Sequence, residues 1–191
     1  MRFLVGVLFG VLLVVVGAAA VVVTGSFNTA ATEQPSRLEK RIAGFALDRS
    51  VAKRATHRKN PHATTPDVLR EGLEEYRENC LVCHGAPGVD AGAIGSGLNP
   101  APPDLTVPSV QARSDGELFW LTAQGIRLTG MPAFAPTHSE DELWKVVAFL
   151  RHLPELTDAE ERELARPDGH SEESGPSSAV PPTPAAGGRP S

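Results

Sequence analysis

The chain has 191 residues, a formal net charge of −5 and an aromatic content of only 5%. This length suits one small domain with additional segments, and the scarcity of aromatic side chains predicts a thin core that a bound apolar group would enlarge. The charge is unevenly distributed: residues 33–60 contain eight Lys or Arg against three Asp or Glu, whereas residues 61–156 contain six against thirteen. The acidic balance of the longer segment argues against nucleic-acid binding.

An apolar run of 21 residues, 3–23, follows Arg2 directly. A helix of this length spans about 30 Å, the thickness of the hydrocarbon core of a bilayer. Residues 1–24 are therefore either a membrane anchor or a cleaved signal, and the length favours the anchor because the apolar part of a signal is usually about 7–15 residues long. Residues 24–36 lack Lys and Arg, which favours placing the rest of the chain outside the cytoplasmic membrane.

Residues 25–64 are predicted to be a linker that carries a basic amphipathic helix over residues 38–58. Apolar side chains share one face of this helix, and cations cover the rest. The apolar positions are Leu38, Ile42, Phe45, Ala46 and Ala52, and the cations are Lys40, Arg41, Arg49, Lys53, Arg54 and Arg58. Such a helix beside a membrane span lies on anionic headgroups or on a partner, and a solvated spacer helix is an equally good interpretation.

The next helix begins at Thr65-Pro66, with threonine at the cap and proline at the first helical position. Its inner face carries Val68, Leu69, Gly72, Leu73 and Tyr76. A glycine inside a helix costs about 1 kcal/mol relative to alanine. We therefore expect another helix to cross closely at Gly72.

This helix leads into Cys80-Leu81-Val82-Cys83-His84, a C-x-x-C-H motif. Two thiols at this spacing reach the two vinyl groups of one porphyrin, and the adjacent histidine then ligates the iron, so the motif predicts covalent haem attachment. The simpler interpretations are a redox dithiol and half of a zinc site. Because these are the only two cysteines, a four-thiolate zinc site is excluded, and no βαβ pattern surrounds the motif.

Residues 85–103 are rich in glycine and proline and contain no phosphate-binding pattern, so we predict a loop wrapped around a flat cofactor. A carbonyl in this loop, at Pro102 or Pro103, is expected to accept the Nδ1 proton of His84 and to fix its ring. Capping boxes at Ser114 to Glu117 and Ser139 to Glu142 begin two later helices.

The later of these two helices is expected to run to about Leu153. Its apolar stripe, from Leu143 to Leu150, should cross the helix that carries Gly72. Trp144 is expected to fill the core, with a position near the haem edge as the alternative.

Between these helices lies Gly130-Met131-Pro132. Apart from Met1, Met131 is the only methionine, and a thioether opposite a histidine is a standard axial pair that raises the reduction potential of haem. The competing interpretation of Met131 is core packing. Arg127 is a candidate partner for a haem propionate, with a surface role as the alternative.

Thr157 begins a last, mostly polar helix, and Ser, Pro, Gly and Glu dominate from Pro167 onward. This composition predicts a disordered tail. The predicted organisation is therefore an anchor or signal (1–24), a linker (25–64), a haem domain (65–156), and a polar helix with a tail (157–191).

The segment from Thr65 to Pro154 resembles the class I c-type cytochromes, and in particular the membrane-anchored, single-haem bacterial ones. The resemblance rests on the C-x-x-C-H motif, on the Gly130-Met131-Pro132 loop, and on Gly72 and Tyr76 at eight and four residues before Cys80. In that family these two residues pack against an aromatic residue of the closing helix, here Phe149.

The resemblance implies an all-α fold around one covalently attached haem c, preceded by a transmembrane helix. It implies thioether links at Cys80 and Cys83, with His84 and Met131 as axial ligands. It also implies assembly on the periplasmic or outer side of the cytoplasmic membrane. The basic helix of residues 38–58 departs from the minimal fold, so its role is not carried over.

The predicted function is electron transfer between membrane or periplasmic redox partners, without a small-molecule substrate and without enzymatic activity of the chain itself. A haem subunit that relays electrons within a larger oxidoreductase is compatible with this prediction. The alternative is an enzyme or sensor whose iron opens to a small ligand such as peroxide or nitric oxide.

Overall fold

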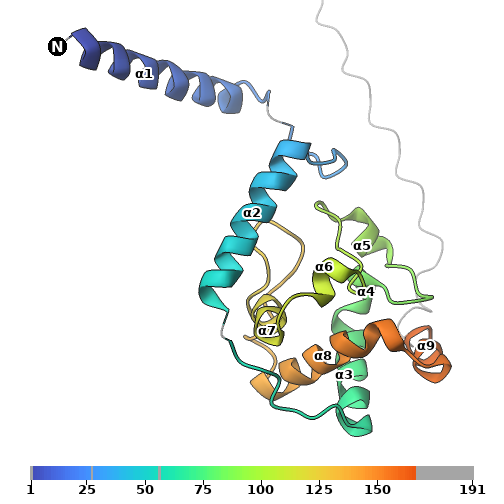
Figure 1. Cartoon of the computed structure of the whole chain (residues 1–191). Helices are drawn as coiled ribbons and strands as arrows, with labels where there is room; N and C mark the ends of the chain where they lie inside the picture. The colour runs from blue at the N-terminus through green and yellow to red at the C-terminus, as the bar shows by residue number, and fades with distance from the viewer. Residues whose placement is uncertain (1, 27, 56, 167–191) are drawn as a thin grey trace, which may run out of the picture.

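The computed structural model describes residues 2–26, 28–55 and 57–166, and within these ranges it is helical (Figure 1). The long helices are α1 (Arg2–Val23), α2 (Arg37–Arg54), α3 (Pro66–Asn79), α7 (Asp115–Gln124) and α8 (Glu140–His152). The shorter ones are α4 (Leu81–His84), α5 (Ala93–Gly97), α6 (Pro108–Gln111), the 3₁₀ helix η1 (Leu153–Glu155) and α9 (Asp158–Leu164). An isolated bridge between Ala86 and Val89 is the only β pairing in the described part of the chain. The all-α prediction is confirmed.

Helix α1 is long and apolar enough to cross a membrane, with a mean hydropathy of 2.9 in its most apolar window. None of its residues is buried against the rest of the chain, and it projects away from the other helices (Figure 1). By length and composition α1 is therefore a candidate membrane span, as predicted.

The core forms where α3 crosses α8. A Cβ atom on Gly72 would overlap the carbonyl oxygen of Lys145 and lie 2.9 Å from the Cβ of Phe149, so glycine allows the two backbones to approach. The Tyr76 and Phe149 rings meet at 5.4 Å between centroids, and both side chains are fully buried. The predicted crossing at Gly72 is confirmed.

Helix α7 also packs against α8. Phe119 stacks on Trp144 with ring centroids 4.2 Å apart, and Trp144 is only 1% exposed, so it fills the core as expected. The capping boxes at Ser114 and Ser139 are both formed. Each serine hydroxyl accepts a hydrogen bond from the backbone N–H of the third residue of its helix, and the carboxylate of that residue accepts one from the serine backbone N–H. Local hydrogen bonding therefore fixes where α7 and α8 begin.

The C-terminal helix α9 starts at a capping box on Thr157. Although its surface is mostly polar, Leu164 is 1% exposed and joins the same core cluster as Leu73 and Leu153. Helix α9 therefore belongs to the packed helical body, which we define as α3 to α9. The predicted disordered tail, from Pro167 onward, lies outside the described residues.

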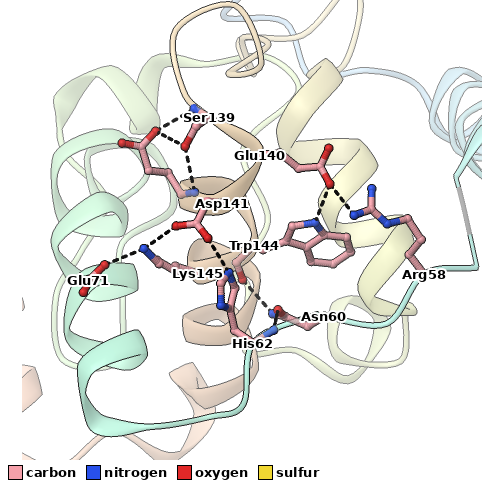
Figure 2. Close-up of polar contacts among 10 residues, drawn as sticks. Arg58, Asn60, His62, Glu71, Ser139, Glu140, Asp141, Trp144 and Lys145 are labelled. Atoms are coloured by element: carbon pink, nitrogen blue, oxygen red, sulfur yellow. Dashed lines mark hydrogen bonds and ion pairs between the residues drawn. The ribbon is translucent and has the colours of Figure 1, made fainter.

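The basic helix is shorter than predicted. It begins at a capping box of Ser36 with Glu39 and ends at Arg54, where Ala55 turns into extended backbone, whereas the sequence pattern predicted a helix over residues 38–58. Beyond it, Arg58 pairs with Glu140 and its guanidinium lies 5.3 Å from the centroid of the Trp144 ring. These contacts with α8 keep residues 57–62 from continuing helix α2 (Figure 2). The periodicity of the sequence does not predict contacts with a distant helix.

Asn60 adds to this attachment. Its side-chain amide donates to the Trp144 carbonyl at 2.8 Å, and its backbone N–H donates to the Asp115 carboxylate at 3.2 Å. We call α2 and residues 57–62 the arm. Helix α2 of the arm packs on α7, and Arg58 and Asn60 of the arm contact α8 (Figure 2). We call the contacts of these two residues with α8 the clasp.

Candidate haem site

The C-x-x-C-H residues lie where α3 passes into α4. Cys80 is both the C-cap of α3 and the N-cap of α4, and His84 is the last residue of α4. Gly85 follows with a φ of +62°, and a Cβ there would lie 2.6 Å from the Val89 carbonyl oxygen, so this turn requires glycine. The buried Tyr76 hydroxyl donates to the Gly85 carbonyl at 2.5 Å, which ties the motif to the core crossing.

Both thiols are free and partly buried. Burial, together with the neighbouring Cys83 thiol, raises the pKa of Cys80 to about 12. In the chain without cofactor, Cys80 is therefore a protonated thiol at neutral pH, and it packs against the core cluster of α3 and α8.

The His84 ring is oriented by one hydrogen bond. Its Nδ1 lies 2.8 Å from the Pro103 carbonyl oxygen, and since a carbonyl only accepts, Nδ1 must carry the proton. Burial lowers the pKa of His84, against the opposite effect of this bond. The ring is thus held neutral with its Nε2 lone pair available as a ligand. The expected carbonyl partner is confirmed, and of the two prolines it is Pro103.

The segment after the motif folds back onto it. Gly92 N–H donates to the Val82 carbonyl at 3.0 Å, and a Cβ on Gly95 would lie 2.8 Å from the Cys83 Cα atom. Residues 93–97 form the short helix α5 within the segment predicted as loop, and Gly95 allows that helix to lie directly against α4.

Met131 lies on a loop that is fastened to the end of α7. The Phe134 N–H donates to the Thr122 carbonyl at 3.3 Å, and the Ile126 N–H donates to the Met131 carbonyl at 3.2 Å. The Met131 N–H in turn donates to the Thr129 hydroxyl at 3.1 Å. The backbone of Met131 is therefore fixed on both sides, and its side chain is half-buried.

Leu98 connects the two parts of the site. A Cβ on Gly130 would lie 2.5 Å from a methyl carbon of Leu98, so Leu98 packs against the Met131 loop. Three residues earlier, Gly95 touches Cys83. The segment 92–98 therefore contacts both the motif helix and the methionine loop, a role that the sequence analysis missed because no local signal marks Leu98.

Arg127 is exposed and makes no ion pair with another described residue. It lies in the same loop as Met131, next to Leu128, whose φ is +62°. The structure therefore leaves the guanidinium accessible, and its role at a propionate remains a prediction.

These residues fit a haem in chemical terms. They comprise two thiols at C-x-x-C spacing, a neutral imidazole with a free Nε2, and a thioether on a fixed loop. A helical fold built around this donor set is that of a c-type cytochrome.

The family comparison leads to the same class. Residues 67–150 match the family model described as Cytochrome C oxidase, cbb3-type, subunit III. This match supports a c-type cytochrome domain in this segment, and the matched family implies haem c as cofactor. The comparison with curated proteins finds no match.

Proposed function

We propose that the chain is a membrane-anchored, single-haem electron-transfer protein or cytochrome subunit. Cys80 and Cys83 would attach the haem covalently, His84 and Met131 would ligate its iron, and Arg127 would pair with a propionate. When bound, the haem supplies one-electron chemistry by cycling between Fe(III) and Fe(II). The family match over residues 67–150 supports an electron-transfer role.

The observation that carries the proposal is the hydrogen bond between His84 Nδ1 and the Pro103 carbonyl, at 2.8 Å. This bond fixes the tautomer that leaves Nε2 free and raises the basicity of the ring as a ligand. A redox dithiol needs no such oriented imidazole.

The chain's own residues would keep the site rigid. Tyr76 fixes the turn after His84, and the Thr129 hydroxyl holds the backbone of Met131. Rigid ligands retained in both oxidation states suit a carrier, because little rearrangement then accompanies electron transfer. Helix α1 would hold the haem domain on the periplasmic side, within reach of redox partner proteins.

The decisive experiment replaces the thioether. Met131→Ala should retain covalently bound haem, because attachment depends on the cysteines, and should lower the reduction potential, because a soft sulfur ligand favours Fe(II). Potentiometric titration of the haem absorbance measures the effect. The matched control is Gln124→Ala, at the exposed end of α7 beside the same loop, which should leave the potential unchanged.

An unchanged potential in Met131→Ala would refute Met131 as a ligand. It would favour an iron with an open position, as in the peroxide or nitric oxide alternative. Nitric oxide binding by the ferrous wild-type protein, followed by absorbance, distinguishes the electron carrier from the protein with an open iron position.

A further inference from the structure

Helix α2 carries apolar side chains on two opposite sides. On one side Val51 is fully buried, and the helix packs on α7. On the other side Leu38, Ile42 and Phe45 are 67%, 61% and 69% exposed. At 100° per residue these three follow one line along the helix, roughly opposite Val51. We call them the outward stripe. The helical body does not cover it.

Cations surround the outward stripe. Arg41 and Lys53 flank it, and Arg49 continues it by one turn; all three are exposed, and none forms an ion pair with a described residue. We call them the outward cations.

The acidic groups of α2 are engaged elsewhere. Glu39 closes the capping box with Ser36, and Asp48 pairs with Arg113 of the body at 2.7 Å. The outward side of α2 is therefore both apolar and positively charged, which is the composition of a helix that lies in a membrane interface.

Two other cations of the arm contact groups within the chain. Arg58 is held by Glu140 and Trp144 in the clasp, and Arg54 donates to the Ser50 hydroxyl at 3.0 Å. Among the cations of α2 that form no ion pair with a described residue, Arg41, Arg49 and Lys53 lie beside the outward stripe, whereas Lys40 lies on the other side of the helix.

The chain keeps α2 close to α1. Thirteen residues, 24–36, separate the two helices, which limits their separation to about 45 Å even when fully extended. In the structure this linker is also fastened to the helical body, because the Asn99 side chain donates to the carbonyls of Ala31 and Glu33 at 2.9 and 2.6 Å. Whatever surface α1 enters is therefore within reach of the outward stripe.

We propose that the outward stripe inserts into the headgroup region of an anionic bilayer, the same one that α1 enters, and that the outward cations bind its lipid phosphates. Residues 61–156 carry an excess of acidic side chains and would be repelled by such a surface. Helix α2 then supplies the attraction and sets which face of the body turns toward the lipid.

A bilayer fits this side of α2 better than a protein partner does. Three apolar side chains form a smaller contact than a stable protein interface needs. They suffice for a helix already tethered to the bilayer, because the tether makes the second contact intramolecular. The proposal does not depend on the haem assignment.

The test uses the full chain in vesicles, with an environment-sensitive fluorophore on a cysteine at Ile42→Cys. The matched control is Lys40→Cys, on the same helix and about 160° away from Ile42. Vesicles of phosphatidylcholine, with or without phosphatidylglycerol, contain a phospholipid that carries a nitroxide quencher in its headgroup region.

With phosphatidylglycerol, the label at position 42 should shift its emission to shorter wavelength and be quenched several-fold more than the label at position 40. Adding Arg41→Gln, Arg49→Gln and Lys53→Gln to the Ile42→Cys chain should abolish most of that difference. Equal quenching at the two positions, quenching indifferent to phosphatidylglycerol, or no quenching at either position would overturn the proposal, and the last result would point to a protein partner.

The unsubstituted chain provides the blank. Its two cysteines should not take up the fluorophore if both are joined to haem. Labelling of the blank would count against the proposed haem attachment. The difference between positions 42 and 40 would still decide the membrane proposal.

Discussion

The helical body and the arm are held together by different forces. The crossing of α3 and α8 is built around apolar contacts between buried side chains, with Tyr76 and Phe149 at 0% exposure. The arm buries Val51 and otherwise relies on polar contacts near the surface, such as the Arg58–Glu140 pair and the bond from Asn60 to the Trp144 carbonyl.

This difference predicts different responses. Apolar burial contributes in proportion to area and is insensitive to pH, so the body should unfold as one unit. Half-exposed polar contacts contribute little each, so the arm should open locally without unfolding the body.

The largest effect is expected in the body. Phe149→Ala removes a fully buried ring that packs on Tyr76 and should lower the free energy of unfolding by about 3–5 kcal/mol. Chemical denaturation measures the loss. Phe45→Ala, at a position 69% exposed on α2, is the control and should change stability by less than about 0.5 kcal/mol. Similar losses in the two variants would contradict the distinction.

The same comparison can be made with two glycines that lie inside helices. Gly72→Ala should cost about 1–3 kcal/mol, because its Cβ would meet the backbone of Lys145 and force α3 and α8 apart. Gly44→Ala should instead stabilise by about 0.5–1 kcal/mol, since nothing lies within 4 Å of a Cβ there. Thermal melting of both variants tests the opposite signs, and a shared sign would show that the crossing is not tight.

A smaller effect is expected for Asn60→Ala, which breaks the clasp. Losing the bond to the Trp144 carbonyl should weaken the attachment of the arm by about 1 kcal/mol. Hydrogen exchange should accelerate in the last turns of α2, while the amides of α8 exchange as before. Lys59→Ala, one residue earlier and exposed, is the control. Acceleration throughout α8 would mean that the arm and the body open together.

The smallest effect concerns pH. Hydrogen bonds from Arg58 and Trp144 hold the pKa of Glu140 below its ordinary value of 4.5. A carboxyl whose pKa is lowered by folding stabilises the folded state above that ordinary value, and the contribution is lost as the pH falls through the lower, folded-state pKa.

The denaturation midpoints of wild type and Glu140→Gln should therefore differ at about pH 6 and converge as the pH falls below the ordinary pKa of 4.5. A difference that stays constant over this range would show that the charge of Glu140 contributes nothing to the clasp.

The sequence by itself predicted the starts of four helices, α3, α7, α8 and α9, and the donor residues of the candidate site. The caps at Thr65, Ser114, Ser139 and Thr157 all form in the structure, because a capping side chain bonds to backbone only two or three residues away. The thiols and the histidine of the C-x-x-C-H motif are adjacent in the chain, so their pattern is equally readable. The roles of Met131 and Arg127 stay predictions.

Tertiary structure decided what depends on distant partners. It ended α2 at Arg54, because Arg58 pairs with Glu140, 82 residues further along. It selected Pro103 as the partner of His84 and brought Leu98 against Gly130. It also determined which apolar side of α2 is buried, since a helix with two apolar sides gives no local indication of which one meets the core. These choices follow from packing between segments far apart in the chain, and neither periodicity nor local hydrogen bonding contains that information.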